Sequence, residues 1–214
     1  MSEKRVILSL DITDEPSALR LAEQLEGEIF AIKIGLASII VNGGKYIRDM
    51  SSYAKVICDF KSADIPKTNA QIAQKALEYN AWGIIVQAFT GKDAIKASVD
   101  VSDRLKVFSL VSMTHEGASY FIDKHVEEMA KISIEAGVYG IVAPGNRPET
   151  LAKVRKLVGE KKIISPGIGV QGGDPITAIK NGSDYVIIGR TIYESKDPLG
   201  TVKEINRAIS AVIR

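Results

Sequence analysis

The sequence predicts an α/β fold, a compact (β/α)8 TIM barrel that forms one domain over residues 1–214. Eight short runs rich in β-branched residues alternate with eight segments of helical pattern, as in a chain of strand–helix units. The runs are almost continuously apolar, which is typical of parallel strands covered on both faces. A length of 214 residues suits a single domain. A doubly wound open sheet shows the same alternation and remains the alternative.

The strand candidates are short, and each is followed by polar or glycine-containing sequence that ends it. In chain order they are 5–10, 30–34, 55–60, 83–86, 105–111, 140–142, 162–165 and 185–188.

The helical segments between them carry start signals. Pro16 lies near the start of the first segment, and Ala18, Leu19, Ala22 and Leu25 form an apolar stripe at helical spacing.

Two later helices begin in the same way. Pro148 opens the segment 149–158, and Asp174 followed by Pro175 is typical of an N-cap and first helical residue. Trp82 precedes the fourth strand, where we expect it to pack rather than to stack on a ligand.

Composition excludes several functional classes. Hydrophobic residues make up 45% of the chain and the net charge of +2 is spread along it, so nucleic acid and membrane surfaces are not expected partners. The first apolar run is too short for a signal peptide, and no segment approaches the ~20 apolar residues of a membrane span. Cys58 is the single cysteine, and with His115 and His125 it supplies a zinc site poorly. We therefore expect a cytoplasmic protein.

A (β/α)8 barrel places its active site at the carboxyl ends of its strands. In this sequence charged and glycine-rich residues follow the strand candidates, which is the pattern of a site. These residues are Asp11, Lys33, Gly35, the segments 59–66, 112–115, 144–146 and 166–173, and Gly189 with Arg190.

Five of them suggest a cluster of alternating charge. Asp59 and Lys61 are two residues apart on a strand and should share one face. Asp64 follows closely, while Lys33 and Asp11 lie at the ends of neighbouring strands. Because buried charges must be paired, such a set would hold an ammonium group at a fixed point, a typical feature of a catalytic centre.

A second group suggests a phosphate site. The loop 166–173 is rich in glycine, and Gly189-Arg190 ends the last strand. Loops after the seventh and eighth strands of such barrels often bind phosphate through backbone N–H groups, and a guanidinium group matches phosphate geometry. His115 lacks an orienting partner, His125 is expected on an exposed helix, and Cys58 is expected to pack as a small hydrophobe.

At this point the sequence resembles a known family. Residues 59–69, DFKSADIPKTN, are similar to the DxKxxDIPxT signature of orotidine 5′-monophosphate decarboxylases. The resemblance covers nearly the whole chain, because other segments follow in family order: 10–14, 32–35, 112–117, 143–146, 165–175 and 187–193.

The resemblance implies decarboxylation of orotidine 5′-monophosphate to uridine 5′-monophosphate, the final step of de novo pyrimidine synthesis, with no cofactor and no metal. It implies that Asp11 and Lys33 contact the ribose hydroxyls and that Lys33 also holds Asp59. Asp59 would lie beside the departing carboxylate, and Lys61 would protonate C6 of the pyrimidine.

The remaining roles follow from the same resemblance. Asp64 and Thr68 would be supplied to the neighbouring subunit's site, which implies a homodimer. Thr114, at a position that is often serine in the family, would bond the pyrimidine edge. The phosphate would be held by the loop that starts at Pro166, and its contacts would be Gly169, Gln171, Gly189 and Arg190.

Two other functions are weighed against this one. Mg²⁺-dependent sugar-phosphate decarboxylases and lyases of the same superfamily share the DxKxxD motif, but they carry a glutamate metal ligand where this chain has Lys33. A protonated lysine cannot ligate Mg²⁺, so the metal-dependent function is the runner-up. A non-catalytic phosphate binder on the same scaffold is disfavoured because Asp59, Lys61 and Asp64 are all present.

Overall fold

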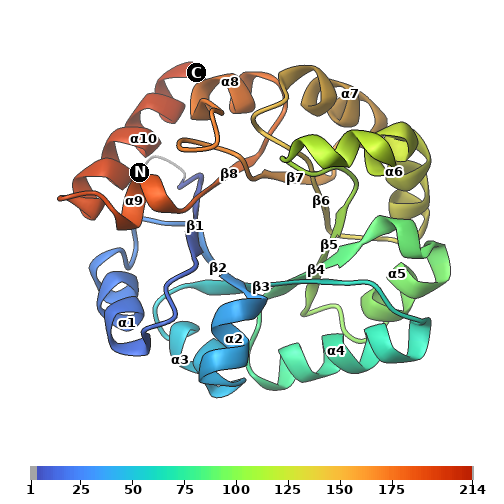
Figure 1. The fold of residues 1–214 in the computed structure, drawn as a ribbon, viewed down its shortest axis with the longest axis horizontal. Coiled ribbons are helices and arrows are strands. Elements are labelled where there is room, and N and C mark those ends of the chain that lie inside the picture. Colours follow the sequence, from blue (N-terminus) through green and yellow to red (C-terminus); the bar gives the residue numbers. More distant parts are fainter. Residues whose placement is uncertain (1–3, 214) are drawn as a thin grey trace.

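The structure, a computed structural model, describes residues 4–213, so residues 1–3 and 214 of the predicted domain lie outside the described residues. Eight parallel strands close into a barrel in the order β1 to β8, and the helices surround it (Figure 1). The predicted (β/α)8 barrel is confirmed. The open-sheet alternative is wrong, because β1 pairs with both β2 and β8.

The strand predictions agree with the structure to within one or two residues at each end. The strands are β1 (Val6–Leu10), β2 (Ala31–Gly35), β3 (Lys55–Ser62), β4 (Gly83–Gln87), β5 (Lys106–Leu110), β6 (Gly140–Val142), β7 (Lys162–Ser165) and β8 (Tyr185–Ile188).

The helices are more numerous than predicted, because two helices follow each of β2 and β8, and short 3-10 helices follow β4 and β5. The α-helices are α1 (Glu15–Gln24), α2 (Leu36–Asn42), α3 (Lys45–Met50), α4 (Pro66–Glu78), α5 (Lys92–Val99), α6 (Val126–Glu135), α7 (Pro148–Val158), α8 (Pro175–Lys180), α9 (Arg190–Tyr193) and α10 (Pro198–Val212). The 3-10 helices are η1 (Ala88–Thr90), η2 (Glu116–Tyr120) and η3 (Ile122–His125).

The predicted start signals act as expected. Asp14 caps α1 by accepting the Ser17 N–H at 3.0 Å, and Asp174 caps α8 by accepting the Thr177 N–H at 2.6 Å. Within residues 4–213, no helix combines the length and the apolar character needed to cross a membrane.

Alternation along the strands separates two apolar cores. The larger core lies between the outer faces of the strands and the helices. The smaller one fills the barrel, where inward side chains come from every strand: Ile7, Ala31, Ile57, Ile85, Phe108, Leu110, Val142, Ile164, Tyr185 and Ile187. The barrel is therefore a packed core, and a cavity can open only beyond this layer.

Aromatic rings close the amino-terminal mouth of the barrel. Phe30, Trp82, Tyr139 and Tyr185 stand at or just before the starts of the even-numbered strands. Phe30 stacks on Tyr185 with ring centroids 3.9 Å apart, and Trp82 meets Tyr139 edge to face at 5.6 Å. The Lys55 ammonium lies 4.6 Å from the Phe30 centroid. The expectation that Trp82 packs inside the protein is confirmed.

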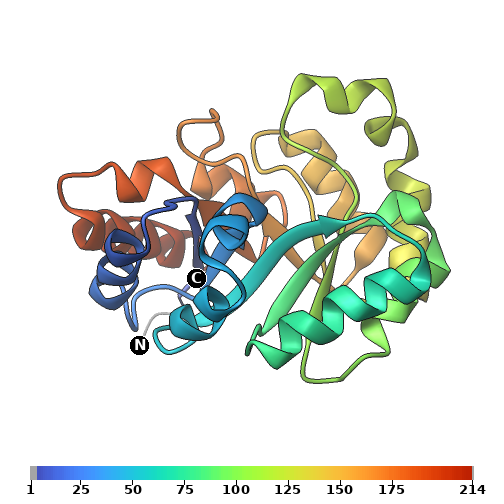
Figure 2. The same ribbon diagram turned by 60° about the horizontal axis from the view of Figure 1, so that its bottom comes forward.

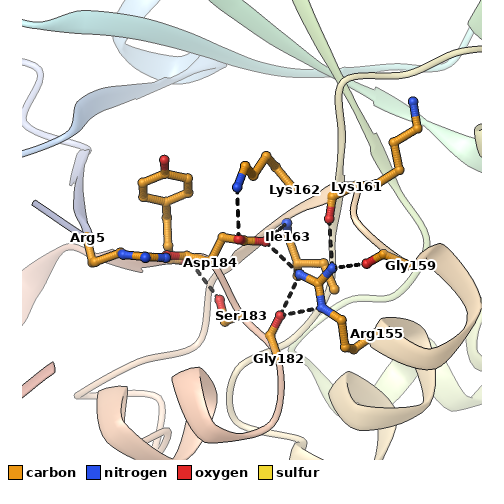
Figure 3. Close-up of polar contacts among 10 residues, drawn as sticks. Arg5, Arg155, Gly159, Lys161, Lys162, Ile163, Gly182, Ser183 and Asp184 are labelled. Carbon is orange, nitrogen blue, oxygen red and sulfur yellow. Dashed lines mark hydrogen bonds and ion pairs between the residues drawn. The ribbon is translucent and has the colours of Figure 1, made fainter. Parts of the chain in front are cut away.

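Near the starts of β7 and β8, Arg155 of α7 connects two loops, the one before β7 and the one before β8 (Figure 3). Its guanidinium group donates to the Gly182 carbonyl at 2.9 and 2.7 Å and to the Lys161 carbonyl at 2.9 Å. It also forms an ion pair with Asp184 at 2.6 Å, and the Asp184 carboxylate accepts the Ile163 N–H at 2.8 Å. One half-buried side chain thus satisfies polar groups that the loops leave open.

We expect Arg155→Ala to lower the free energy of unfolding by about 3 kcal/mol, because several half-buried acceptors lose a charged donor together. Urea denaturation of the variant measures this loss. Arg104→Ala is the matched control, because Arg104 is exposed and should change stability little. An Arg155→Ala midpoint equal to that of the control would contradict the prediction.

Candidate active site

A cavity of about 550 Å³ opens at the carboxyl ends of the strands, on the side opposite the aromatic rings. Nine of the twelve residues that were given roles in the predicted site line it: Asp11, Lys33, Asp59, Lys61, Thr114, Pro166, Gln171, Gly189 and Arg190. The predicted residues Asp64, Thr68 and Gly169 do not line it. The barrel therefore brings together side chains that are far apart in the sequence.

At one wall of the cavity, Asp59 lies between two lysines. The Lys61 ammonium is 2.8 Å from both Asp59 carboxylate oxygens, and the Lys33 ammonium is 3.0 Å from Oδ2. Lys33 is also 3.8 Å from Asp11, whose other oxygen accepts the Ser9 hydroxyl at 3.0 Å. The predicted cluster of alternating charge brings these four residues together: Asp11, Lys33, Asp59 and Lys61.

Burial and charge act in opposite directions on Asp59. Burial raises the pKa of its carboxyl, but the Lys33 and Lys61 ammonium groups outweigh burial and hold that pKa below its usual value. The side chains of Asp59 and Lys33 are each only 8% exposed, whereas that of Lys61 is 36% exposed. Asp59 is therefore an anion at neutral pH that holds a solvent-accessible ammonium group in place.

The backbone at Lys61 departs from a regular strand. Lys61 has φ of +46°, in the left-handed region that a side chain rarely adopts. In the same place the pairing of β3 with β4 shifts, so that Cys58 pairs with Ile84 but Ser62 pairs with Val86. Such a bulge re-aims a side chain, and here it accompanies the contact between Lys61 and Asp59. Strained backbone of this kind is concentrated at functional sites.

Opposite this cluster, the loop after β7 has a folded shape of its own. Gly167 and Gly169 have φ of +94° and +77°. The Gly169 N–H donates to the Gly173 carbonyl at 2.8 Å, and the Gly173 N–H donates to the Gly167 carbonyl at 2.9 Å. In this structure the Gly169 N–H thus stabilises the loop itself, while Gln171 and Pro166 line the cavity.

Gly169→Ala is expected to deform this loop. A β-carbon at Gly169 would lie 2.1 Å from the Thr191 hydroxyl oxygen, and the positive φ adds strain. We expect the affinity for a phosphorylated ligand to fall about 100-fold, since the loop no longer fits beside α9. Calorimetric titration with a nucleoside monophosphate measures this, and Gly159→Ala, in open space away from the cavity, controls for strain alone. Equal affinities in the two variants would refute the prediction.

The start of α9 contributes two further side chains to the cavity. Arg190 lines it and is exposed, so its guanidinium group is accessible to an anion. Tyr193 lies one turn later, and burial, followed by the Asp11 and Glu194 carboxylates, raises the pKa of its hydroxyl. The Tyr193 hydroxyl therefore remains a hydrogen-bond donor throughout the neutral range.

Among the cavity-lining residues that sequence reasoning missed are Ser9 and Tyr193. Ser9 was accessible to prediction, because it lies two residues before Asp11 on the same face of a strand. Tyr193 was accessible in the same way, because it follows Arg190 by one helical turn.

Asp64 and Thr68 lie beyond β3 and outside the cavity. Asp64 is exposed, and its carboxylate accepts the neighbouring Ile65 N–H at 2.7 Å. Large apolar side chains are exposed in the segments that follow the neighbouring strands β2, β3 and β4: on α2, next to Asp64 and on η1. They are Ile40, Val41, Ile65 and Phe89.

Other reactive side chains do not join the site. Cys58 is buried in β3, and burial raises the pKa of its thiol to about 12, so it is not a nucleophile. His125 is exposed and contacts Glu128 at 2.6 Å. Over residues 4–213, three or more His, Cys, Asp or Glu side chains do not gather in an arrangement able to hold a metal ion.

Comparison with known proteins gives consistent matches over the whole chain. The family model described as Orotidine 5′-phosphate decarboxylase / HUMPS family matches residues 4–205. Orotidine 5′-phosphate decarboxylase from Thermoplasma acidophilum is 44% identical, covering 100% of this chain and 99% of the relative. The enzyme of that name from Methanosarcina mazei is 41% identical, covering 98% and 96%.

Solved structures agree with these matches. The structure of orotidine 5′-monophosphate decarboxylase from Methanocaldococcus jannaschii, complexed with the inhibitor BMP, has a TM-score of 0.90 at 35% identity and covers 96% of this chain and 98% of that one. The enzyme from Pyrococcus horikoshii OT3 has a TM-score of 0.89 at 34% identity, covering 95% and 98%.

Proposed function

Because this chain belongs to the orotidine 5′-phosphate decarboxylase / HUMPS family, we propose that it decarboxylates orotidine 5′-monophosphate to uridine 5′-monophosphate without a metal ion or cofactor. One observation carries the proposal. The Lys61 ammonium lies 2.8 Å from both oxygens of the buried Asp59 carboxylate, inside a cavity whose other side holds a glycine-rich loop and Arg190.

Lys61 supplies the chemistry that this reaction needs. Loss of CO2 leaves an electron pair at C6 of the pyrimidine, with no adjacent carbonyl or imine to accept it. An ammonium group about 4 Å away stabilises that charge by about 4 kcal/mol at an effective dielectric of 20, or about three powers of ten in rate. Lys61 then transfers a proton to C6, and Asp59 keeps the Lys61 ammonium group directed at that atom.

The other cavity residues orient the nucleotide. Arg190 and the loop after β7 bind the phosphate, Asp11 and Lys33 bind the ribose hydroxyls, and the Thr114 hydroxyl bonds the pyrimidine edge. We expect Gln171, which lies on the same loop and lines the cavity, to bridge the phosphate and the pyrimidine. Binding of the phosphate thus contributes to ordering the site around the reacting carbon.

The position of Lys33 favours this reaction over a Mg²⁺-dependent one. Its ammonium lies 3.0 Å from Asp59, at the place where metal-dependent relatives carry a glutamate ligand. A cation bound there would meet a fixed positive charge, which costs free energy. This contact therefore supports the metal-free proposal.

The proposal includes a homodimer in which Asp64 and Thr68 complete the partner's site. Asp64 is exposed after β3, and exposed apolar side chains follow the neighbouring strands: Ile40 and Val41 after β2, Ile65 after β3, and Phe89 after β4. Exposed apolar patches of this kind are typical of protein interfaces. Pairing of two copies through this side would bury these side chains and carry each Asp64 toward the other cavity.

A mixture of two inactive variants tests the shared site. Lys61→Ala and Asp64→Ala dimers are each expected to be inactive, yet a hybrid dimer contains one site with both residues intact. After subunit exchange we expect about a quarter of the wild-type activity, since half of the dimers are hybrids with one working site. A mixture that stays inactive while native mass spectrometry detects hybrids would refute sharing.

The function itself is tested by mixing the purified protein with orotidine 5′-monophosphate in EDTA and following the ultraviolet change as product forms. Full turnover in chelator is the expected result. Absence of turnover by folded protein would overturn the proposal, and activity only on sugar phosphates with Mg²⁺ would establish the alternative.

We expect the reaction to take place in the cytoplasm, where the free thiol of Cys58 is stable.

A further inference from the structure

One carboxylate from the segment after β5 contacts a residue that lines the cavity. Residues 112–125 rise from the end of β5 on the side of the molecule where the loop after β7 also lies (Figure 2). The segment carries exposed aromatic side chains, but its Asp123 is only 22% exposed and belongs to η3. Asp123 has no part in the chemistry described above.

Asp123 is linked to both ends of the short stretch 112–115, directly to its first residue and through Arg147 to its last. Its Oδ1 accepts the hydroxyl of Ser112, a fully buried residue that lines the cavity, at 2.7 Å. Its Oδ2 forms an ion pair with Arg147 at 2.5 Å. Arg147 in turn donates to the His115 carbonyl at 2.7 Å. One carboxylate thus holds the stretch directly at its first residue and, through Arg147, at its last.

Thr114 lies between these two fixed points and faces the cavity. The Asn146 amide donates to the Thr114 carbonyl at 3.2 Å, so the backbone on either side of this residue is held. The direction of the Thr114 hydroxyl depends on the shape of this stretch, which the contacts of Asp123, Arg147 and Asn146 hold.

We propose that Asp123 is a positioning residue that aims the Thr114 hydroxyl at the pyrimidine; the proposal rests on the proposed function. Without the carboxylate, the buried Ser112 hydroxyl loses its acceptor, and the Arg147 guanidinium loses its counterion while only 24% exposed. Leaving these two groups unpaired costs free energy, so we expect both to form other contacts and the stretch that carries Thr114 to move.

Steady-state kinetics with Asp123→Ala tests this inference first. We expect kcat/KM for orotidine 5′-monophosphate to fall about 100-fold, as a displacement of about 1 Å in a contact group does. Asp123→Asn retains an acceptor for Ser112 and should lose less. Glu116→Gln is the matched control, because Glu116 is exposed on the same segment, and it should retain wild-type kinetics.

A double-mutant cycle separates positioning from a general structural role. With Thr114→Val already present, Asp123→Ala should cost little more, because the group that it aims is gone. With Arg190→Ala present, Asp123→Ala should retain its full cost, because the phosphate end is independent. Full additivity with Thr114→Val would overturn the inference, as would wild-type kinetics in folded Asp123→Ala.

Hydrogen–deuterium exchange in the absence of substrate keeps this test independent of the proposed function. In Asp123→Ala the amides of 112–117 should exchange faster than in wild type, while those of β1 and β2 should not change. Unchanged exchange in 112–117 would overturn the inference even if the wild-type protein is an active decarboxylase. Faster exchange in a protein that does not turn over the nucleotide would count against the proposed function and support the positioning of the stretch.

Discussion

Lys61→Ala is expected to lower kcat for orotidine 5′-monophosphate by about 10⁵-fold or more, because the variant loses an electrostatic contribution of about three powers of ten and the proposed proton donor. The Lys61 ammonium is held 2.8 Å from both Asp59 oxygens, so water cannot replace it at the same point with the same charge. Single-turnover measurement of CO2 release gives the rate of the chemical step. Lys131→Ala, an exposed lysine of α6, is the control and should match wild type.

The backbone of Lys61 allows a second comparison. Because φ is +46° there, Lys61→Gly should be more stable than Lys61→Ala by about 1 kcal/mol, although both lack the ammonium group. Equal loss of activity with unequal stability would separate the chemistry of the side chain from the strain of the backbone. Substantial turnover in either variant would contradict the assigned role of Lys61.

Asp59→Asn is expected to have the second largest effect, and it should lower both activity and stability. Loss of the carboxylate releases the Lys61 ammonium from its position, and we expect kcat/KM to fall about 10³-fold. It also leaves Lys33, whose side chain is 8% exposed, without its partner at 3.0 Å, which should cost about 3 kcal/mol of unfolding free energy. Urea denaturation at pH 7 measures the second effect, with Asp103→Asn at an exposed position as the control.

The pH dependence of this loss has a definite sign. Lysine neighbours hold the pKa of Asp59 below its ordinary value of 3.8 in the folded protein, despite burial. The carboxylate therefore stabilises the folded state at pH values above 3.8, and this contribution disappears as the pH falls through the lowered pKa. The stability difference between wild type and Asp59→Asn should be constant from pH 6 to pH 8 and shrink in strong acid. A difference that grows on acidification would show that Asp59 is not held as an anion.

The barrel and most of its cavity were predictable because both follow from periodicity. Apolar runs such as 140–142 and 185–188 locate parallel strands, and the residues just after them gather at one end of the barrel. The alternation rule alone brings Asp59 and Lys61 to one face. Local sequence was sufficient for these features, because it locates the strands, and the barrel fold then brings the ends of the strands together.

The remaining features depend on contacts that no local pattern encodes. Lys61 adopts a left-handed backbone conformation although it is not a glycine, so the sequence carries no signal for it. Asp123 and Arg147 are 24 residues apart, and Arg155 and Asp184 are 29 apart, so their pairing emerges only after the barrel closes. Sequence spacing also suggested one cluster with Asp64 in it, whereas in the folded chain Asp64 lies outside the cavity.

The aromatic rings at the amino-terminal mouth determine where substrate can enter the barrel and where products can leave it. The amino-terminal end of the barrel is closed by Phe30, Trp82, Tyr139 and Tyr185 together with the apolar layer above them. Packed interiors have few voids as large as a small molecule, so a ligand cannot leave through this end. Substrate entry and the release of CO2 and product must therefore all take place through the cavity at the carboxyl ends of the strands. The loop after β7 lies beside this opening, so in the proposed function it would affect product release as well as phosphate binding.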